Sequence, residues 1–126
     1  MSSIFSFSIG GFYANNIKIR KHYNSIEIQK SDAPIFHEEE KVLIKVSKEE
    51  WIKFWRKMDK INVWEWQKDY FNPDILDGTQ WELTIQGNGR GGIKVFGSNA
   101  YPDNFQSFLN AVNLIANTKI TYDKDI

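Results

Sequence analysis

The chain has 126 residues and contains equal numbers of basic and acidic side chains, 16 of each, so its formal net charge is zero. A balanced charge produces no long-range field toward nucleic acid or an anionic membrane, and we expect neither as a partner. The sequence contains no cysteine, which excludes disulfides and thiolate catalysis and is typical of a cytoplasmic protein. We therefore expect one cytoplasmic domain spanning residues 1–126.

Apolar and polar residues alternate through the first 28 residues, with the period of a β-strand. Turn-forming Gly, Asn and Ser residues at 10–11, 15–16 and 24–25 separate the runs. The pattern predicts three antiparallel strands, whose apolar residues are Phe5, Phe7, Ile9, Ile17, Ile19, Ile26 and Ile28. The same alternation over 42–46 predicts a fourth strand.

A helix is predicted to begin at Ser47, because Ser47 and Glu50 have the spacing of a capping box. Its apolar stripe is formed by Trp51, Phe54, Trp55, Met58 and Ile61. The helix is predicted to end at Asn62. Residues 63–67 alternate and are predicted to be extended, whereas the polar stretch 69–78 is predicted to be a loop.

A hairpin follows, because Trp81, Leu83 and Ile85 alternate with polar residues before the glycine-rich segment 87–92 and a second strand from Ile93. The last helix is predicted to begin at Pro102, with the core residues Phe105, Phe108, Leu109, Val112 and Ile115. Residues 118–126 form either an edge strand or a frayed end.

These elements predict an α+β fold. We expect a mainly antiparallel sheet of about six or seven short strands, with two helices packed on one face and the other face partly open.

The spacing of residues between Trp51 and Phe108 is similar to that of small uncharacterised bacterial proteins. The shared patterns are W-x-x-F-W, V-W-x-W, Y-x-N-P-D-I-x-D-G-x-x-W-x-L-x-I and G-S-N-A-Y-P-x-x-F-x-x-F. They cover less than half of the chain. The resemblance implies a fold but no catalytic residue, and small domains of this build often act as immunity or anti-defence partners.

Three segments resemble ligand sites and have simpler interpretations. The glycines at 87–92 lead into a strand, whereas a nucleotide loop opens a helix, so a hairpin is favoured. The run His37 to Glu40 lacks metal-site spacing and is typical of a solvated charged segment. The full calcium-loop pattern is missing around the acids Asp69, Asp74 and Asp77. These residues are interpreted as turn formers. We therefore expect no metal and no cofactor.

The best candidate surface is a basic stripe on the second strand, where alternate side chains point away from the core. A solvated outer face is the simpler alternative for this stripe. A second candidate is the loop that leads into the last helix, which would adjoin the stripe if the hairpins curl toward that helix, or would serve only as a helix lead-in. The candidate residues are Lys18, Arg20, His22, Ser98, Asn99 and Tyr101. We expect exchange of Lys18 and Arg20 for glutamate to leave folding nearly intact.

The sequence shows no nucleophile paired with a base, which favours a non-enzymatic role. We expect a protein-interaction domain of the inhibitor type, such as a bacterial immunity or phage anti-defence protein. The alternative is a small-ligand-binding domain, for example a nucleotide-sequestering one. It would use a cleft between the loop at 97–102 and the Trp-rich segment, which contains Trp51, Trp55, Trp64 and Trp66. An enzyme of unknown class is the third interpretation.

Overall fold

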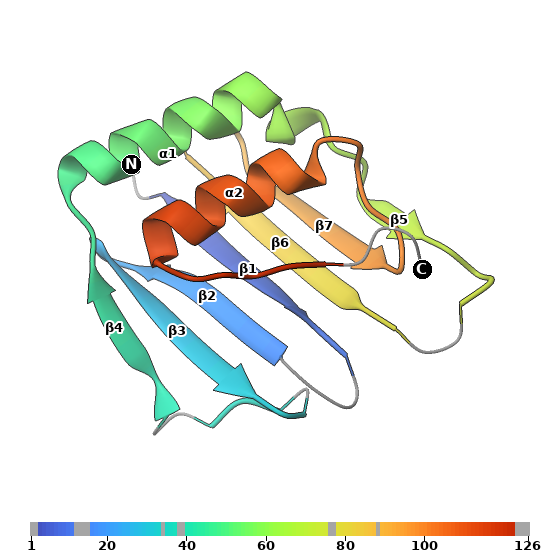
Figure 1. Ribbon diagram of the computed structural model, residues 1–126. Helices are drawn as coiled ribbons and strands as arrows, with labels where there is room; N and C mark the ends of the chain where they lie inside the picture. Colours follow the sequence, from blue (N-terminus) through green and yellow to red (C-terminus); the bar gives the residue numbers. More distant parts are fainter. Residues whose placement is uncertain are drawn as a thin grey trace.

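A computed structural model of the protein describes residues 3–11, 16–33, 35–37, 40–75, 78–87 and 89–122 (Figure 1). The described residues form a seven-stranded sheet and two α-helices, which confirms the predicted α+β class. The elements are β1 (Ile4–Gly10), β2 (Asn16–His22), β3 (Ser25–Ser31), β4 (Val42–Lys45), α1 (Lys48–Ile61), the 3₁₀-helix η2 (Val63–Glu65), β5 (Asp69–Phe71), β6 (Gln80–Gln86), β7 (Ile93–Ser98) and α2 (Phe105–Ala116).

The strand order in the sheet is β4-β3-β2-β1-β6-β7-β5. All neighbours are antiparallel except β5 and β7, which run parallel. β1 lies at the centre, where Ser6 pairs with Arg20 of β2 on one side and with Thr84 of β6 on the other. β1 therefore joins the two halves of the sheet.

Both helices pack on the same face of the sheet (Figure 1). Phe5 of β1 contacts Phe54 of α1 edge to face, with the ring centroids 4.9 Å apart, and Phe7 contacts Phe108 of α2 in the same way at 5.1 Å. Trp81 is only 1% exposed, which confirms that the alternating residues of β6 point toward the helices. Each buried side chain of this size contributes about 1.5–3 kcal/mol.

The predicted capping box at the start of α1 is confirmed. The Ser47 hydroxyl accepts a hydrogen bond from the Glu50 N–H at 3.1 Å, and the Glu50 carboxylate accepts one from the Ser47 N–H at 3.1 Å. Asn62 ends the helix in the left-handed conformation with a φ of 57°. Asparagine tolerates this conformation better than most residues, which explains the stop at this position.

The prediction that residues 63–67 are extended is wrong for Val63–Glu65, which form η2. The two tryptophans of this segment pack against different partners. Trp64 stacks on Trp55, with the ring centroids 6.4 Å apart, whereas Trp66 packs edge to face against Trp81 at 6.0 Å. The alternation of tryptophan and polar residues therefore reflects two separate packing sites and not the two faces of a strand.

Two other boundaries differ from the prediction. Residues Asp69–Phe71, predicted as part of a loop, form β5, which is held by hydrogen bonds from the Phe96 N–H to the Lys68 carbonyl and from the Asn72 N–H to the Ser98 carbonyl. A three-residue strand is too short to show alternation, so the sequence carries no signal for it. Helix α2 begins at Phe105, because the turn from Pro102 closes with the Phe105 N–H donating to the Pro102 carbonyl.

Residues 118–122 form neither helix nor strand and follow α2 back along the sheet (Figure 1). The Asn113 side chain anchors this segment, because its carbonyl oxygen accepts from the Ile120 N–H and its amide donates to the Ile120 carbonyl. Residues 123–126 of the predicted edge strand or frayed end lie outside the described residues. Among the described residues, no helix has the length and apolar character needed to cross a bilayer.

Candidate functional site

The sheet face opposite the helices, here called the open face, carries no helix in the described part of the chain (Figure 1). Side chains alternate between the two faces of a strand, and cross-strand partners share a face. The register therefore places Arg20 of β2 beside Glu27 of β3 and Ser6 of β1 on the open face. Leu43 of β4 continues the same row at the edge of the sheet.

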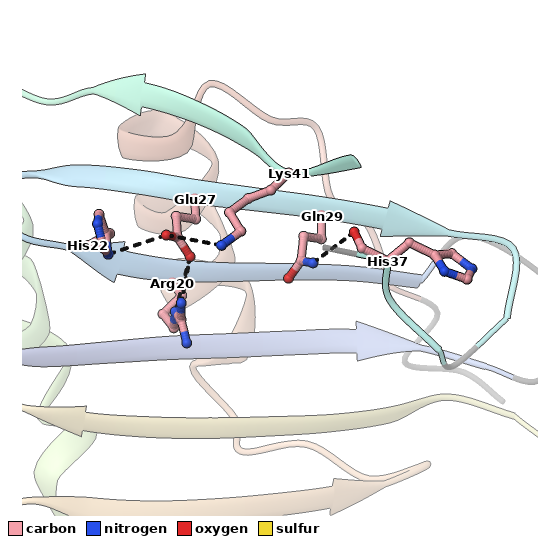
Figure 2. A network of polar contacts seen from close by, with 6 residues as sticks. All are labelled: Arg20, His22, Glu27, Gln29, His37 and Lys41. Carbon is pink, nitrogen blue, oxygen red and sulfur yellow. Dashed lines mark hydrogen bonds and ion pairs between the residues drawn. The ribbon is translucent and has the colours of Figure 1, made fainter. Parts of the chain in front are cut away.

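Glu27 is the centre of a polar network on this face (Figure 2). It is only 5% exposed. One carboxylate oxygen, Oε2, accepts hydrogen bonds from Arg20 Nη2 at 2.8 Å and Nε at 3.2 Å. The other oxygen, Oε1, lies 3.3 Å from His22 Nδ1 and 3.5 Å from Lys41 Nζ. A single buried carboxylate thus holds three nitrogen-bearing side chains from β2 and the segment before β4.

Opposing effects act on the Glu27 carboxyl group. Burial raises its pKa, because a charged group loses solvation in the interior. The Arg20 hydrogen bonds and the charges of Arg20, Lys41 and His22 lower the pKa, and together they leave it below the ordinary value of 4.5. Glu27 is therefore ionised at neutral pH and fixes the positions of the cations around it.

The hairpin between β2 and β3 determines this arrangement. Its loop contains only Tyr23 and Asn24, with Tyr23 at a φ of 55°, and His22 is paired with Ser25. Counting back from that pair places Arg20 directly opposite Glu27. The turn predicted at 24–25 shifts the register, so Glu27 and Lys41 are missing from the predicted site. A two-residue loop at 23–24 was the signal that would have found them.

The character of the open face changes from one side to the other. The central strand β1 contributes the small side chains of Ser6 and Ser8, and Lys18 and Glu82 flank Ser8 on the neighbouring strands. At the far side, Phe96 of β7 and Phe71 of β5 are 41% and 68% exposed. Their registers, Asp69 opposite Phe96 and Phe71 opposite Ser98, make the two rings diagonal neighbours. The face is cationic near β2 and aromatic near β5.

The structure brings only half of the predicted surface residues together. Lys18, Arg20 and His22 follow one another along the open face of β2, as predicted. Ser98 lies three strands away at the end of β7, where it is buried and accepts a hydrogen bond from Gln80. Because β1 and β6 separate these strands, Ser98 does not adjoin the basic stripe.

The other two residues of the helix lead-in have structural contacts. Asn99 is buried with a φ of 58°, and its side-chain oxygen accepts a hydrogen bond from the Thr79 N–H at 2.8 Å. Tyr101 lies on the helix side of the sheet and packs against Trp81 and Phe105. These contacts correct the expectation that the lead-in forms a rim beside the stripe.

Packed aromatic rings fill the region between the loop at 97–102 and the Trp-rich segment, where a ligand cleft is predicted. Trp81 stacks with Tyr70 at 6.0 Å and with Tyr101 at 6.4 Å, and it contacts Phe105 at 4.8 Å. A hollow of about 1140 Å³ lies instead at one end of the sheet. Its polar lining includes Asn16, Lys30, His37, Thr79 and Lys119.

The acidic segments and the glycine segment are partly described. Glu38, Glu39, Asp77 and Asn88 lie outside the described residues. Among the residues that are described, no three His, Cys, Asp or Glu side chains gather as metal ligands would. The glycine segment connects β6 to β7, as predicted, and the Arg90 N–H donates to the Gly87 carbonyl.

Comparison with known proteins gave no match: no family model fits the chain, and no curated protein or solved structure is significantly similar to it. The resemblance to small bacterial proteins therefore stays a prediction. The site rests on its own geometry, which is a buried carboxylate that organises cations on an uncovered sheet face.

Proposed function

We propose that the protein is a non-enzymatic interaction domain that blocks a protein partner with its open face, in the manner of a bacterial immunity or phage anti-defence inhibitor. The observation that carries this proposal is the Glu27 network. Burying a carboxylate is costly unless charged hydrogen bonds compensate for the lost hydration. Glu27 is buried while the side chains of Arg20 and His22 remain about half exposed, so both side chains stay accessible to a partner on this face.

A protein partner fits the mixed character of this face. Cations held in fixed positions lose little side-chain entropy when an acidic partner binds, and they steer its approach. The exposed rings of Phe71 and Phe96 supply the aromatic contact area that protein interfaces favour. The absence of cysteine supports a cytoplasmic setting.

The proposal is tested with a residue that covers the middle of the open face. Ser8 lies between Lys18 and Glu82, and Ser8→Tyr places a bulky ring there with a residue that favours strands. Partners are captured from host lysate, identified, and mapped by hydrogen exchange. We expect the mapped protection to lie on β1 and β2, and Ser8→Tyr to weaken binding at least about tenfold.

The matched control is Lys53→Tyr, which adds the same ring at an exposed position of α1 on the opposite layer. This variant is expected to bind like the wild type. A folded Ser8→Tyr protein with unchanged affinity for the identified partner would contradict the proposal.

The hollow at the end of the sheet favours a second candidate function, which is the binding of a small polar ligand such as a nucleotide. The hollow has room for such a molecule, and its lining offers Lys30 and Lys119 to an anionic group and Asp32 and Glu40 to hydroxyl or amino donors. Native mass spectrometry of protein purified from the host separates the two functions. A stoichiometric metabolite without a protein partner supports this second candidate and contradicts the first.

A further inference from the structure

The free edge of β4 has the features of a docking site for another strand. β4 is the outermost strand of the sheet on its side and pairs only with β3 among the described residues. Val42 and Leu43, which point to opposite faces, are 57% and 60% exposed. An edge strand with exposed apolar residues on both faces invites pairing with another chain unless it is covered.

The hairpin register shows which backbone groups of β4 are free. Since the Tyr23–Asn24 loop has two residues, His22 and Ser25 form the hydrogen-bonded kind of pair. The backbone groups of Ser25 and Glu27 therefore point toward β2. Those of Ile26 and Ile28 point toward β4 and bond to Ile44 and Val42. It follows that the N–H and C=O groups of Leu43 and Lys45 point outward from the sheet edge.

The charges along this edge favour an acidic occupant. Lys41 and Lys45 flank Leu43 on the open face, and β4 itself contains no acidic residue. Lys41 contacts Glu27, while the side chain of Lys45 is exposed. Glu40, the nearest described acid along the chain, precedes Lys41, and its N–H donates to the His37 carbonyl. Two copies of β4 paired together would bring these lysines to one seam without intervening acids.

We propose that β4 binds an extended segment of a partner protein as an added strand, with alternating acidic and apolar residues. The acidic side chains lie over Lys41 and Lys45 on the open face, and the apolar ones cover Val42 and Ile44 on the helix side. This inference rests on the proposed protein-binding function and specifies how the partner is recognised.

The first experiment uses an eight-residue peptide of alternating Glu and Val, titrated into ¹⁵N-labelled protein. We expect the largest amide shifts at Leu43 and Lys45. Two further peptides are N-methylated, one at every Glu and one at every Val. In antiparallel pairing the Glu amides face β4, so methylation of Glu abolishes binding while methylation of Val is tolerated. The reverse result supports parallel pairing, and an equal effect of both methylations overturns the proposal.

Variants of the protein test the edge proposal independently of the peptides. Leu43→Pro removes the outward donor without breaking a bond to β3, and proline is tolerated on such an edge. Lys45→Glu reverses the charge next to it. Both changes should lower the affinity for the Glu/Val peptide at least about tenfold. Arg56→Glu on the exposed face of α1 is the charge-matched control and should leave binding unchanged. If Leu43→Pro does not fold, the methylated peptides still decide the question.

The proposed function and the edge inference can fail separately. If Ser8→Tyr abolishes binding of the native partner but Leu43→Pro and Lys45→Glu do not, the open face stands as the site and the edge inference falls. If sedimentation shows that the wild type dimerises and that Leu43→Pro prevents it, the occupant is a second copy, and an acidic partner segment is excluded.

Discussion

The indole of Trp81 on β6 lies directly beneath Gly97 on β7. The two residues are cross-strand partners, and a Cβ atom on Gly97 would overlap the indole nitrogen of Trp81. That nitrogen donates to the Ala100 carbonyl at 3.0 Å, and this hydrogen bond fixes the position of the ring. The absence of a side chain at position 97 therefore allows Trp81, the largest of the fully buried side chains that the structure describes, to occupy its position.

Gly97→Ala should destabilise the protein by about 1–3 kcal/mol, because the indole must move out of a close-packed core. Urea unfolding measures the change. Gly91→Ala is the matched control: nothing lies within 4 Å of a Cβ atom there, and the change should be within about 0.5 kcal/mol. Equal stability of the two variants would contradict the packing described for Trp81.

Glutamate substitutions at Lys18 and Arg20 should have different effects, although the sequence treats the two positions alike. Arg20 donates two hydrogen bonds to the buried Glu27, so Arg20→Glu removes them and adds a like charge, at a cost of about 1–3 kcal/mol. Lys18→Glu should stay within about 0.5 kcal/mol of the wild type. The difference is measured by urea unfolding at pH 7. Equal effects would mean that Arg20 does not hold Glu27.

Because of Glu27, the free energy of unfolding should decrease as the pH is lowered into the acid range. Its pKa in the folded protein lies below the ordinary value of 4.5, so its stabilising effect is complete above that value. The effect is lost as the pH falls through the folded-state pKa. Unfolding free energies measured across the acid range should show this decline.

Glu27→Gln should cost about 1.5–3 kcal/mol at pH 7 and should flatten the acid decline. A residual slope is expected, because the exposed Glu50 also has a lowered pKa from its hydrogen bonds with Ser47. A decline as steep in Glu27→Gln as in the wild type would assign the acid sensitivity to other groups.

The capping box gives a test of the helix start. Ser47→Ala removes the acceptor for the Glu50 N–H and should cost about 1 kcal/mol, whereas Ser47→Asp restores an acceptor and should recover most of the loss. Thermal unfolding followed by circular dichroism compares the three proteins. If Ser47→Asp were as unstable as Ser47→Ala, hydrogen bonding at this cap would not explain the cost.

Much of the fold was predictable because local patterns and final packing agree. Phe5 and Phe7 alternate with serines and are both fully buried, and the Ser47 box begins α1 as its spacing indicates. The parallel strand β5 was not predictable, since its three residues are defined only by pairing with β7, which lies far along the chain. A segment of three residues is too short to show the hydrophobic alternation from which a strand is predicted.

The site was predictable only in part, for a related reason. The outward direction of Lys18, Arg20 and His22 follows from alternation on a single strand. The role of Glu27 requires the register between two strands, and an error of one residue in the turn changes every pair. Asn99 was ambiguous because asparagine suits both a ligand loop and a left-handed turn, and only its hydrogen bond to Thr79 distinguishes them.

The central position of β1 also governs how the chain reaches this structure. β1 pairs with β6, so residues at 4–10 meet residues at 80–86. Closing so long a loop carries an entropic cost, and topologies dominated by such distant contacts fold slowly. During synthesis, one side of β1 stays unpaired until β6 has left the ribosome. Of the strands that have two neighbours in this sheet, β1 therefore remains longest with only one of them in place.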